Sequence, residues 1–204
     1  MRYELARFTV RLGTAPAVLA GIEAHVKAPE AHGTLLGCFV SEIGALNQII
    51  LFRGFADDAE MVDARWRIQS QDDPFGAGEA IVAMDFTGYA PFSFSPPIVP
   101  GAFGPVYEIR TYHTRHGGLA GVESVWGPVI AKRMALSPLT VAMRALEGAP
   151  RFTHIWPFAS LDARAQLRTQ AVKDGIWPPP GGPGLLTPDM QSVIALPAAF
   201  SPLA

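Results

Sequence analysis

A histidine and a tryptophan in the segment 151–168 are the first candidates for chemistry in this sequence. One residue separates His154 from Trp156 within an alternating apolar run, so a β-strand would place both on one face. A neutral imidazole exchanges protons near pH 7, which makes His154 a candidate general base or ligand contact. The alternative is a histidine of the core or of an interface, hydrogen-bonded to a neighbouring side chain, which is the more common role for a lone histidine.

Glu108, Arg110 and Tyr112 alternate in the same way along the segment that opens the second half of the chain. In a strand these three side chains would share one face, and Tyr107 would point the other way, toward the core. The guanidinium of Arg110 would then either bind a carboxylate of a ligand or form an ion pair with Glu108. In the first interpretation Glu108, Arg110, Tyr112 and Trp156 are ligand-binding residues around a catalytic His154. In the second interpretation the ion pair is structural.

The sequence gives no motif for a metal or a cofactor. His113 and His116 form an HxxH pair in a polar turn, but metal ligation needs three or four donors and no cysteine or carboxylate cluster joins them. Glycine-rich nucleotide-binding motifs and the GxSxG nucleophile turn are absent, so we expect no cofactor. Cys38, the only cysteine, lies in the apolar run LLGCFV, which predicts a buried and unreactive thiol.

The composition limits the possible partners. The net charge is −2 and no Lys/Arg stripe is present, so nucleic acid is not an expected partner. Charged residues make up 17% of the chain, against roughly 25% in an average soluble protein. This low fraction favours apolar surface that is covered in a homo-oligomer. No apolar run approaches the roughly 20 residues that span a bilayer, and the first residues alternate like a strand rather than a leader, so we expect a cytoplasmic protein with no integral membrane segment.

The hydrophobic pattern predicts the order β-α-β-β-α-β twice. Period-2 segments indicate strands, and apolar residues at i, i+3 and i+4 indicate helices. In the first half we expect strands at 3–12, 33–40, 48–52 and 79–86 and helices at 14–27 and 57–69. In the second half we expect strands near 107–112, 139–145, 152–156 and 191–196 and helices at 121–134 and 161–173, with Pro128 causing a kink or a restart in the first of these helices.

We therefore expect an α+β protein of two tandem ferredoxin-like (βαββαβ) units, at residues 1–90 and 105–204. The proline-rich segment 91–104 would link them, and the insertion 178–184 would form a rigid loop on the second unit only. Strand 48–52 is apolar on both faces, which favours burial on both sides. The open sheet faces would then pack into a dimeric-α/β-barrel-like pseudo-dimer with antiparallel sheets. The sequence leaves open whether this barrel closes within one chain or between chains.

These segments resemble the NIPSNAP family of the dimeric α/β-barrel superfamily. The resemblance is carried by four motifs and covers nearly the whole chain as two copies: YEL at 3–5, YEIRTY at 107–112, SEIGALNQ at 41–48 and HIWPFASLDAR at 154–164. It implies the barrel fold and some oligomer. It implies no particular reaction, although the wider superfamily includes cofactor-free oxygenases, haem-degrading enzymes and isomerases, and eukaryotic relatives are associated with mitochondria and with vesicle or mitophagy proteins.

The two copies differ in their polar residues. Where the second copy has Arg110 and His154, the first has Ala6 and Leu51, and Arg53 stands in place of a tryptophan. We therefore expect the second unit to hold a small, largely apolar molecule in a cavity of the barrel, as a binding protein or as a cofactor-independent oxygenase or isomerase. The alternative is a non-catalytic oligomeric adaptor or assembly protein that acts through protein–protein interfaces.

Overall fold

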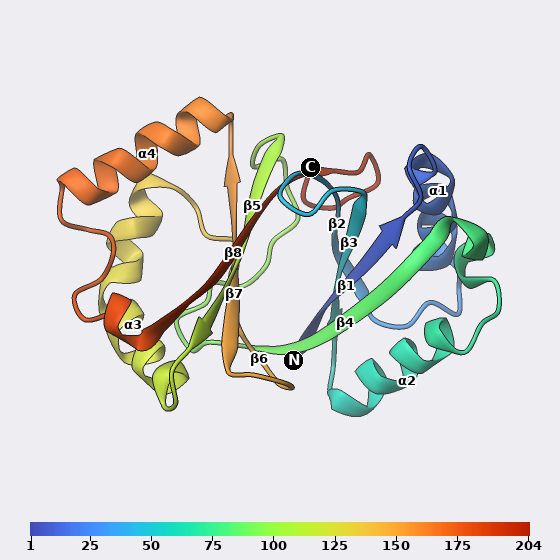
Figure 1. Ribbon diagram of the computed structural model, residues 1–204, viewed down its shortest axis with the longest axis horizontal. Helices are drawn as coiled ribbons and strands as arrows, with labels where there is room; N and C mark the ends of the chain where they lie inside the picture. The colour runs from blue at the N-terminus through green and yellow to red at the C-terminus, as the bar shows by residue number, and fades with distance from the viewer.

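The computed structural model describes residues 1–204 and contains the predicted elements in the predicted order (Figure 1). The first unit consists of β1 (Arg2–Val10), α1 (Ala15–Lys27), β2 (Thr34–Ile43), β3 (Gln48–Phe55), α2 (Asp58–Gln69) and β4 (Ile81–Pro91). The second unit consists of β5 (Val106–Thr114), α3 (Gly118–Leu136), β6 (Val141–Ala145), β7 (Arg151–Phe158), α4 (Leu161–Lys173) and β8 (Leu186–Pro197).

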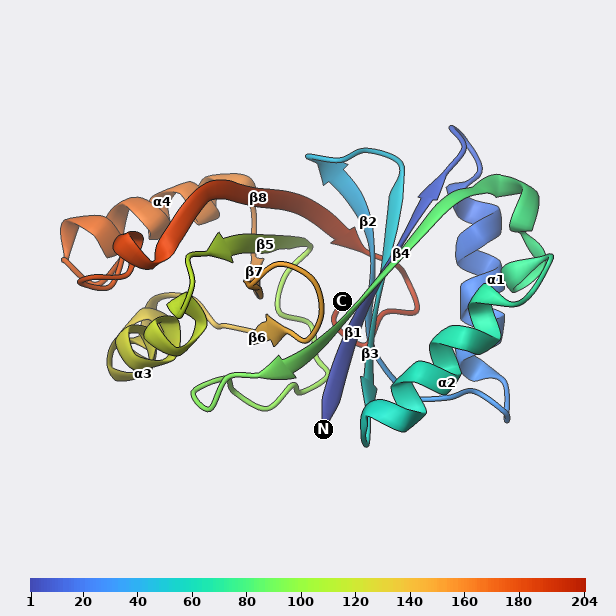
Figure 2. The ribbon, with the colours of Figure 1, turned by 60° about the horizontal axis from the view of Figure 1, so that its bottom comes forward.

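All eight strands join in one closed antiparallel barrel, in the order β1-β3-β2-β8-β5-β7-β6-β4. Each unit contributes a four-stranded ferredoxin-like sheet, and the two sheets meet at the pairs β2–β8 and β4–β6. The helices lie outside the barrel, α1 and α2 against the first sheet and α3 and α4 against the second, at opposite ends of the molecule (Figures 1 and 2). The predicted fold class is confirmed. The barrel also closes within a single chain, so a second copy is not needed to complete it.

Capping residues explain where two of the helices begin, and strand pairing explains why one strand is longer than predicted. Asp57 and Ser160 cap α2 and α4, each side chain accepting a hydrogen bond from a backbone N–H of the first turn. Helix α3 continues through Pro128, so of the two expected effects, a kink or a restart, the restart is absent. Strand β4 runs five residues past the predicted end at position 86, because Tyr89–Pro91 pair with β6 and close the barrel.

Strand alternation divides the apolar residues into layers. One cluster fills the barrel interior with residues of both units, among them Leu5, Phe52, Tyr107 and Ile155. Separate clusters lie between each sheet and its own helices, and in the second unit this outer cluster is rich in aromatic rings. Cys38 is fully buried in the outer cluster of the first unit, and burial raises the pKa of its thiol to about 12, as expected for an unreactive cysteine.

None of the helices combines the length and the apolar character that crossing a membrane requires.

A helix glycine provides a test of the packing in the first unit. A Cβ on Gly21 of α1 would overlap the backbone carbonyl oxygen of Phe75, in the short helical segment packed against α1. We expect Gly21→Ala to lower the free energy of unfolding by about 1–3 kcal/mol, because the backbone of that segment must move. The control is Gly184→Ala, whose Cβ would meet open space and should leave stability unchanged or raise it by about 0.4–1 kcal/mol. Urea denaturation measures both, and a gain in stability for Gly21→Ala would contradict this packing.

Candidate functional site

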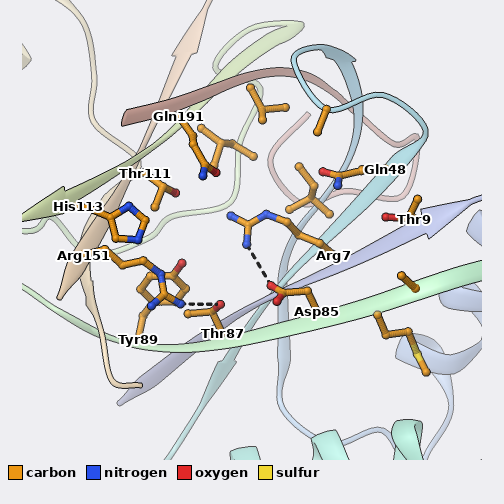
Figure 3. A pocket seen from close by; sticks show the side chains of 16 residues that line it. Arg7, Thr9, Gln48, Asp85, Thr87, Tyr89, Thr111, His113, Arg151 and Gln191 are labelled. Carbon is orange, nitrogen blue, oxygen red and sulfur yellow. Dashed lines mark hydrogen bonds and ion pairs between the residues drawn. The ribbon is translucent and has the colours of Figure 1, made fainter. Parts of the chain in front are cut away.

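The second sheet has a cavity on each side. One, of about 370 Å³, lies at a mouth of the barrel (Figure 3). The other, of about 410 Å³, lies outside the barrel, between the second sheet, α3, α4 and the loop around Pro178 and Gly182. We call them the barrel pocket and the outer cavity. Both have the size of a typical small-molecule site, so their linings decide between them.

The barrel pocket is polar and is built by both units. Its polar lining consists of Arg7, Thr9, Gln48, Asp85, Thr87, Tyr89, Thr111, His113, Arg151 and Gln191 (Figure 3). Glu108, Arg110 and Tyr112 share one face of β5, and the same alternation places Thr111 and His113 on the opposite face. The sequence pattern therefore predicts that these two residues lie on one side of the sheet, where they line the barrel pocket. The pairing of residues from the two units could not be predicted.

The charged groups of the barrel pocket find partners within its own wall. Arg7 Nη1 lies 3.6 Å from Asp85 Oδ1, and Arg151 Nη2 donates to Thr87 Oγ1 at 3.2 Å (Figure 3). His113 is partly exposed, and His116 lies in an exposed turn. The structure contains no group of three or more potential metal ligands. Arg7 therefore has a carboxylate in the wall, whereas Arg151 has a neutral hydroxyl there.

The outer cavity combines aromatic and apolar surface with arginines. Trp126 of α3 and Trp177 of the loop after α4 pack edge to face with ring centroids 4.5 Å apart, and Leu186 and Met190 of β8 also line the cavity. The polar part of the lining is Arg110, Tyr112, Arg133 and Arg168. The proline-rich insertion expected on the second unit supplies Pro178, Pro179, Gly182 and Pro183.

The structure brings the predicted site residues together, but on the other side of the sheet from the one expected. Arg110 and Tyr112 line the outer cavity, whereas Glu108, His154 and Trp156 are buried beside it, at 1%, 3% and 3% exposure. The expectation that they face the inside of the barrel is wrong. The intervening residues of β5 and β7 fill the interior, so these five side chains face the helices.

Glu108 is the centre of an ion-pair cluster. It accepts hydrogen bonds from Arg110 Nη1 at 2.5 Å, from Ser192 Oγ at 2.8 Å and from Arg164 Nη2. Burial acts to raise the pKa of this carboxyl, but the bond from Arg164 and the charge of Arg110 outweigh it and lower the pKa to about 2. The ion pair between Glu108 and Arg110 considered from the sequence is therefore present. Arg110 Nε also donates to the hydroxyl of Tyr112, which positions that hydroxyl at the cavity wall.

His154 lies in an aromatic enclosure. Its ring is about 5.0 Å from the rings of both Tyr112 and Trp126, and its Nδ1 accepts a hydrogen bond from Trp156 Nε1 at 2.5 Å. Because Nδ1 accepts, the neutral ring carries its proton on Nε2, which has no partner. Burial, followed by the charge of Arg110, lowers the pKa of His154 well below 6.5. In this arrangement the ring supports Tyr112 and Trp126 and has no free acceptor.

The lowered pKa of His154 predicts a pH dependence of stability. Below pH 6.5 the unfolded chain binds a proton at this residue and the folded chain does not, so stability falls as the pH falls, by up to about 1.4 kcal/mol per pH unit. His154→Phe should remove this contribution between pH 6.5 and pH 5, although the loss of the bond to Trp156 lowers stability at every pH. His116→Gln, at an exposed turn, is the control. Chemical denaturation at several pH values measures the slope, and an unchanged slope in His154→Phe would contradict the buried neutral ring.

A closed barrel of two βαββαβ units with all helices outside is the dimeric α/β-barrel fold contained in one chain. An anthrone oxidase-like protein of known structure superimposes on it with a TM-score of 0.67, at 14% identity, over 98% of this chain and 93% of the other. A protein from Lactobacillus acidophilus whose name proposes a monooxygenase gives a TM-score of 0.65, at 10% identity, over 96% and 93% of the two chains. At these identities the similarity establishes the fold alone.

Sequence comparison identifies the family. The NIPSNAP family model matches twice, at residues 3–96 and 107–202. A Dictyostelium discoideum protein, the "Protein NipSnap homolog", is 27% identical over 146 residues, which span 70% of this chain and 65% of that protein, less than two thirds of its length. The chain belongs to the NIPSNAP family, as two tandem copies.

Proposed function

We propose that this protein binds a small molecule with a largely apolar body in the outer cavity of its second unit. The observation that carries the proposal is a cavity of about 410 Å³ bounded by Trp126, Trp177, Leu186 and Met190, while the deep interior of the barrel is filled with side chains. Indole rings and a few fixed polar groups are the usual lining of a small-molecule site. Arg110 and Tyr112 supply such polar groups, in the unit that the sequence indicated.

Native mass spectrometry of the purified protein, followed by dissociation of any bound molecule, tests this proposal. Leu186→Trp would fill the outer cavity from β8 and should abolish the bound mass without lowering the melting temperature by more than a few degrees. Ala83→Trp is the matched control, because it would fill the barrel pocket instead. A bound molecule that survives Leu186→Trp and is lost in Ala83→Trp would move the site to the barrel and contradict the proposal.

A catalytic form of the same proposal is cofactor-independent oxygenation or isomerisation of the bound molecule. The specific observation in favour is the Tyr112 hydroxyl, held by Arg110 at the wall of an otherwise apolar cavity. The names of the two structural neighbours point to oxygenation. Oxygen uptake with anthrone, which consumes one O₂ and yields anthraquinone and water, is a direct assay. Activity that is lost in Tyr112→Phe would support catalysis at this site, and no uptake above the uncatalysed rate would contradict oxygenation of this substrate class.

The second candidate is assembly through protein–protein contacts. Val62 and Trp66 lie one turn apart on α2 and are 57% and 66% exposed, an apolar pair of the kind found in interfaces. An oligomer that used this face should be weakened by Trp66→Glu. Light scattering measures the change, and a monomer at high concentration would count against the assembly role and against the expected homo-oligomer.

A further inference from the structure

The wall of the outer cavity carries more positive charge than the fold requires. Four guanidiniums, those of Arg110, Arg133, Arg164 and Arg168, surround the single carboxylate of Glu108. Arg110 and Arg164 are hydrogen-bonded to Glu108 Oε1, whereas Arg168 Nη1 is 3.9 Å from Oε2, too far for a hydrogen bond. The cluster therefore contains four positive charges and one negative charge.

Arg133 has no carboxylate of its own. Its side chain is 4% exposed, it lines the outer cavity, and its Nη1 has no hydrogen-bond partner. Its guanidinium lies over the ring of Trp156, 4.4 Å from the centroid, which fixes its position but supplies no negative charge. Burial, followed by the charge of Arg168, lowers the pKa of Arg133 to about 10, as expected for a cation without a counter-ion.

The corresponding cluster around Glu4 of the first unit is balanced, and one of its carboxylates is supplied by Glu147 of the second unit. The strand register aligns Glu4 with Arg53 and Glu108 with Trp156, so the two glutamates occupy equivalent positions. Glu4 binds Arg53 at 2.6 Å and Arg65 at 3.0 Å, and the carboxylate of Glu147 lies 3.3 Å from Arg65. Two carboxylates thus face two arginines, which shows that the fold itself does not demand an excess of cations.

The remaining arginines of the second cluster have no such compensation. Arg65 and Arg168 are both the eighth residue of the second helix of their unit. Arg65 has two carboxylate partners, and Arg168 has only the distant oxygen of Glu108. The arginines without a close carboxylate are thus Arg133 and Arg168, and both line the outer cavity beside Arg110.

We propose that the molecule bound in the outer cavity is a carboxylate with an aromatic or alicyclic body, whose anionic group is held by Arg110, Arg133 and Arg168. Guanidiniums match the geometry of a carboxylate, and a bound anion would supply the partner that Arg133 lacks. The body of the ligand would lie against Trp126 and Trp177. This inference rests on the proposed function, because it names the chemical class of the ligand for the same cavity.

Isothermal titration with 2-naphthoate and its neutral analogue 2-naphthamide tests the charge separately from the cavity. The two probes share one ring system and differ in charge, so we expect naphthoate to bind roughly 10- to 100-fold more tightly. Arg133→Gln and Arg168→Gln should each remove most of this preference, because each should weaken the binding of naphthoate far more than that of naphthamide. Arg65→Gln, at the equivalent helix position of the first unit, is the control and should change neither affinity.

The outcomes distinguish the two proposals. Equal affinities for the two probes would overturn the anionic ligand and leave the proposed cavity standing. Binding of neither probe would overturn both, because the cavity would then not accept an apolar body. A preference for naphthoate that survives in both Arg133→Gln and Arg168→Gln would place the recognition of charge elsewhere and also overturn the inference. Circular dichroism of each variant checks folding, and Arg133→Gln should melt at or above the wild-type temperature because it removes an unpaired buried charge.

Discussion

Replacing Glu108 with glutamine should lower the free energy of unfolding by about 3–5 kcal/mol at pH 7, the usual result of removing one partner from a buried ion pair. Glu108 is 1% exposed and is the only carboxylate among four arginines. Glutamine keeps the shape and one acceptor oxygen but no charge, so Arg110 and Arg164 would repel each other without compensation. Chemical denaturation measures the change.

The pH dependence of the same variant provides an internal check. The pKa of Glu108 is lowered to about 2 in the folded state, from its ordinary value of 4.5, so its stabilising contribution is complete above pH 4.5 and is lost as the pH falls toward 2. The difference between wild type and Glu108→Gln should therefore shrink over this interval. Glu147→Gln, whose side chain is 42% exposed, is the control and should cost less than about 1 kcal/mol. Equal losses in the two variants would contradict the central role of Glu108.

Truncation of Trp126 to alanine should cost about 3–5 kcal/mol, as for other buried aromatic side chains. Trp126 is 4% exposed and packs edge to face with Phe152, Trp177 and His154, at centroid distances of 5.1, 4.5 and 5.0 Å. Its removal would take away the centre of the layer between α3 and the second sheet. The outer cavity would also grow into the space left behind, so larger ligands should gain affinity relative to smaller ones.

Trp66→Ala is the matched control, since Trp66 is also a helix tryptophan but is 66% exposed. We expect a change within about 0.5 kcal/mol. The two tryptophans differ because Trp126 packs between α3 and the second sheet, whereas Trp66 lies on the surface. A large loss for Trp66→Ala in the monomer, or a small one for Trp126→Ala, would contradict the layer assignment.

Strand and helix periodicity predicted the fold well because each helix covers one sheet face. The similar segments that begin at Tyr3 and Tyr107 indicated the duplication. The second helix of each unit begins within one residue of its predicted position. The side of the sheet could not be predicted in the same way. Alternation groups His154 with Trp156, but the opposite face of β7 also carries apolar residues such as Ile155, so the strand pattern does not show which face lines the barrel interior.

Strand periodicity could not predict which helix residues line the outer cavity. Arg133 and Arg168 come from α3 and α4, and the position of each depends on how a helix docks on the sheet. A signal for one of them was available: Arg164 and Arg168 are four residues apart in α4, and residues at this spacing share one helix face. Arg133 gave no such signal, and only the packing of α3 against Trp156 reveals it.

Because both halves of the barrel lie in one polypeptide, their sequences can differ. In a symmetric dimer every substitution is made twice, so a change that equips one site alters the other as well. Here the half that carries Glu4 and Arg53 can be selected for stability alone, while the half that carries Glu108 and Arg133 can accumulate unneutralised charge. A covalent tether also makes the encounter of the halves independent of protein concentration, so dilution should not open the barrel.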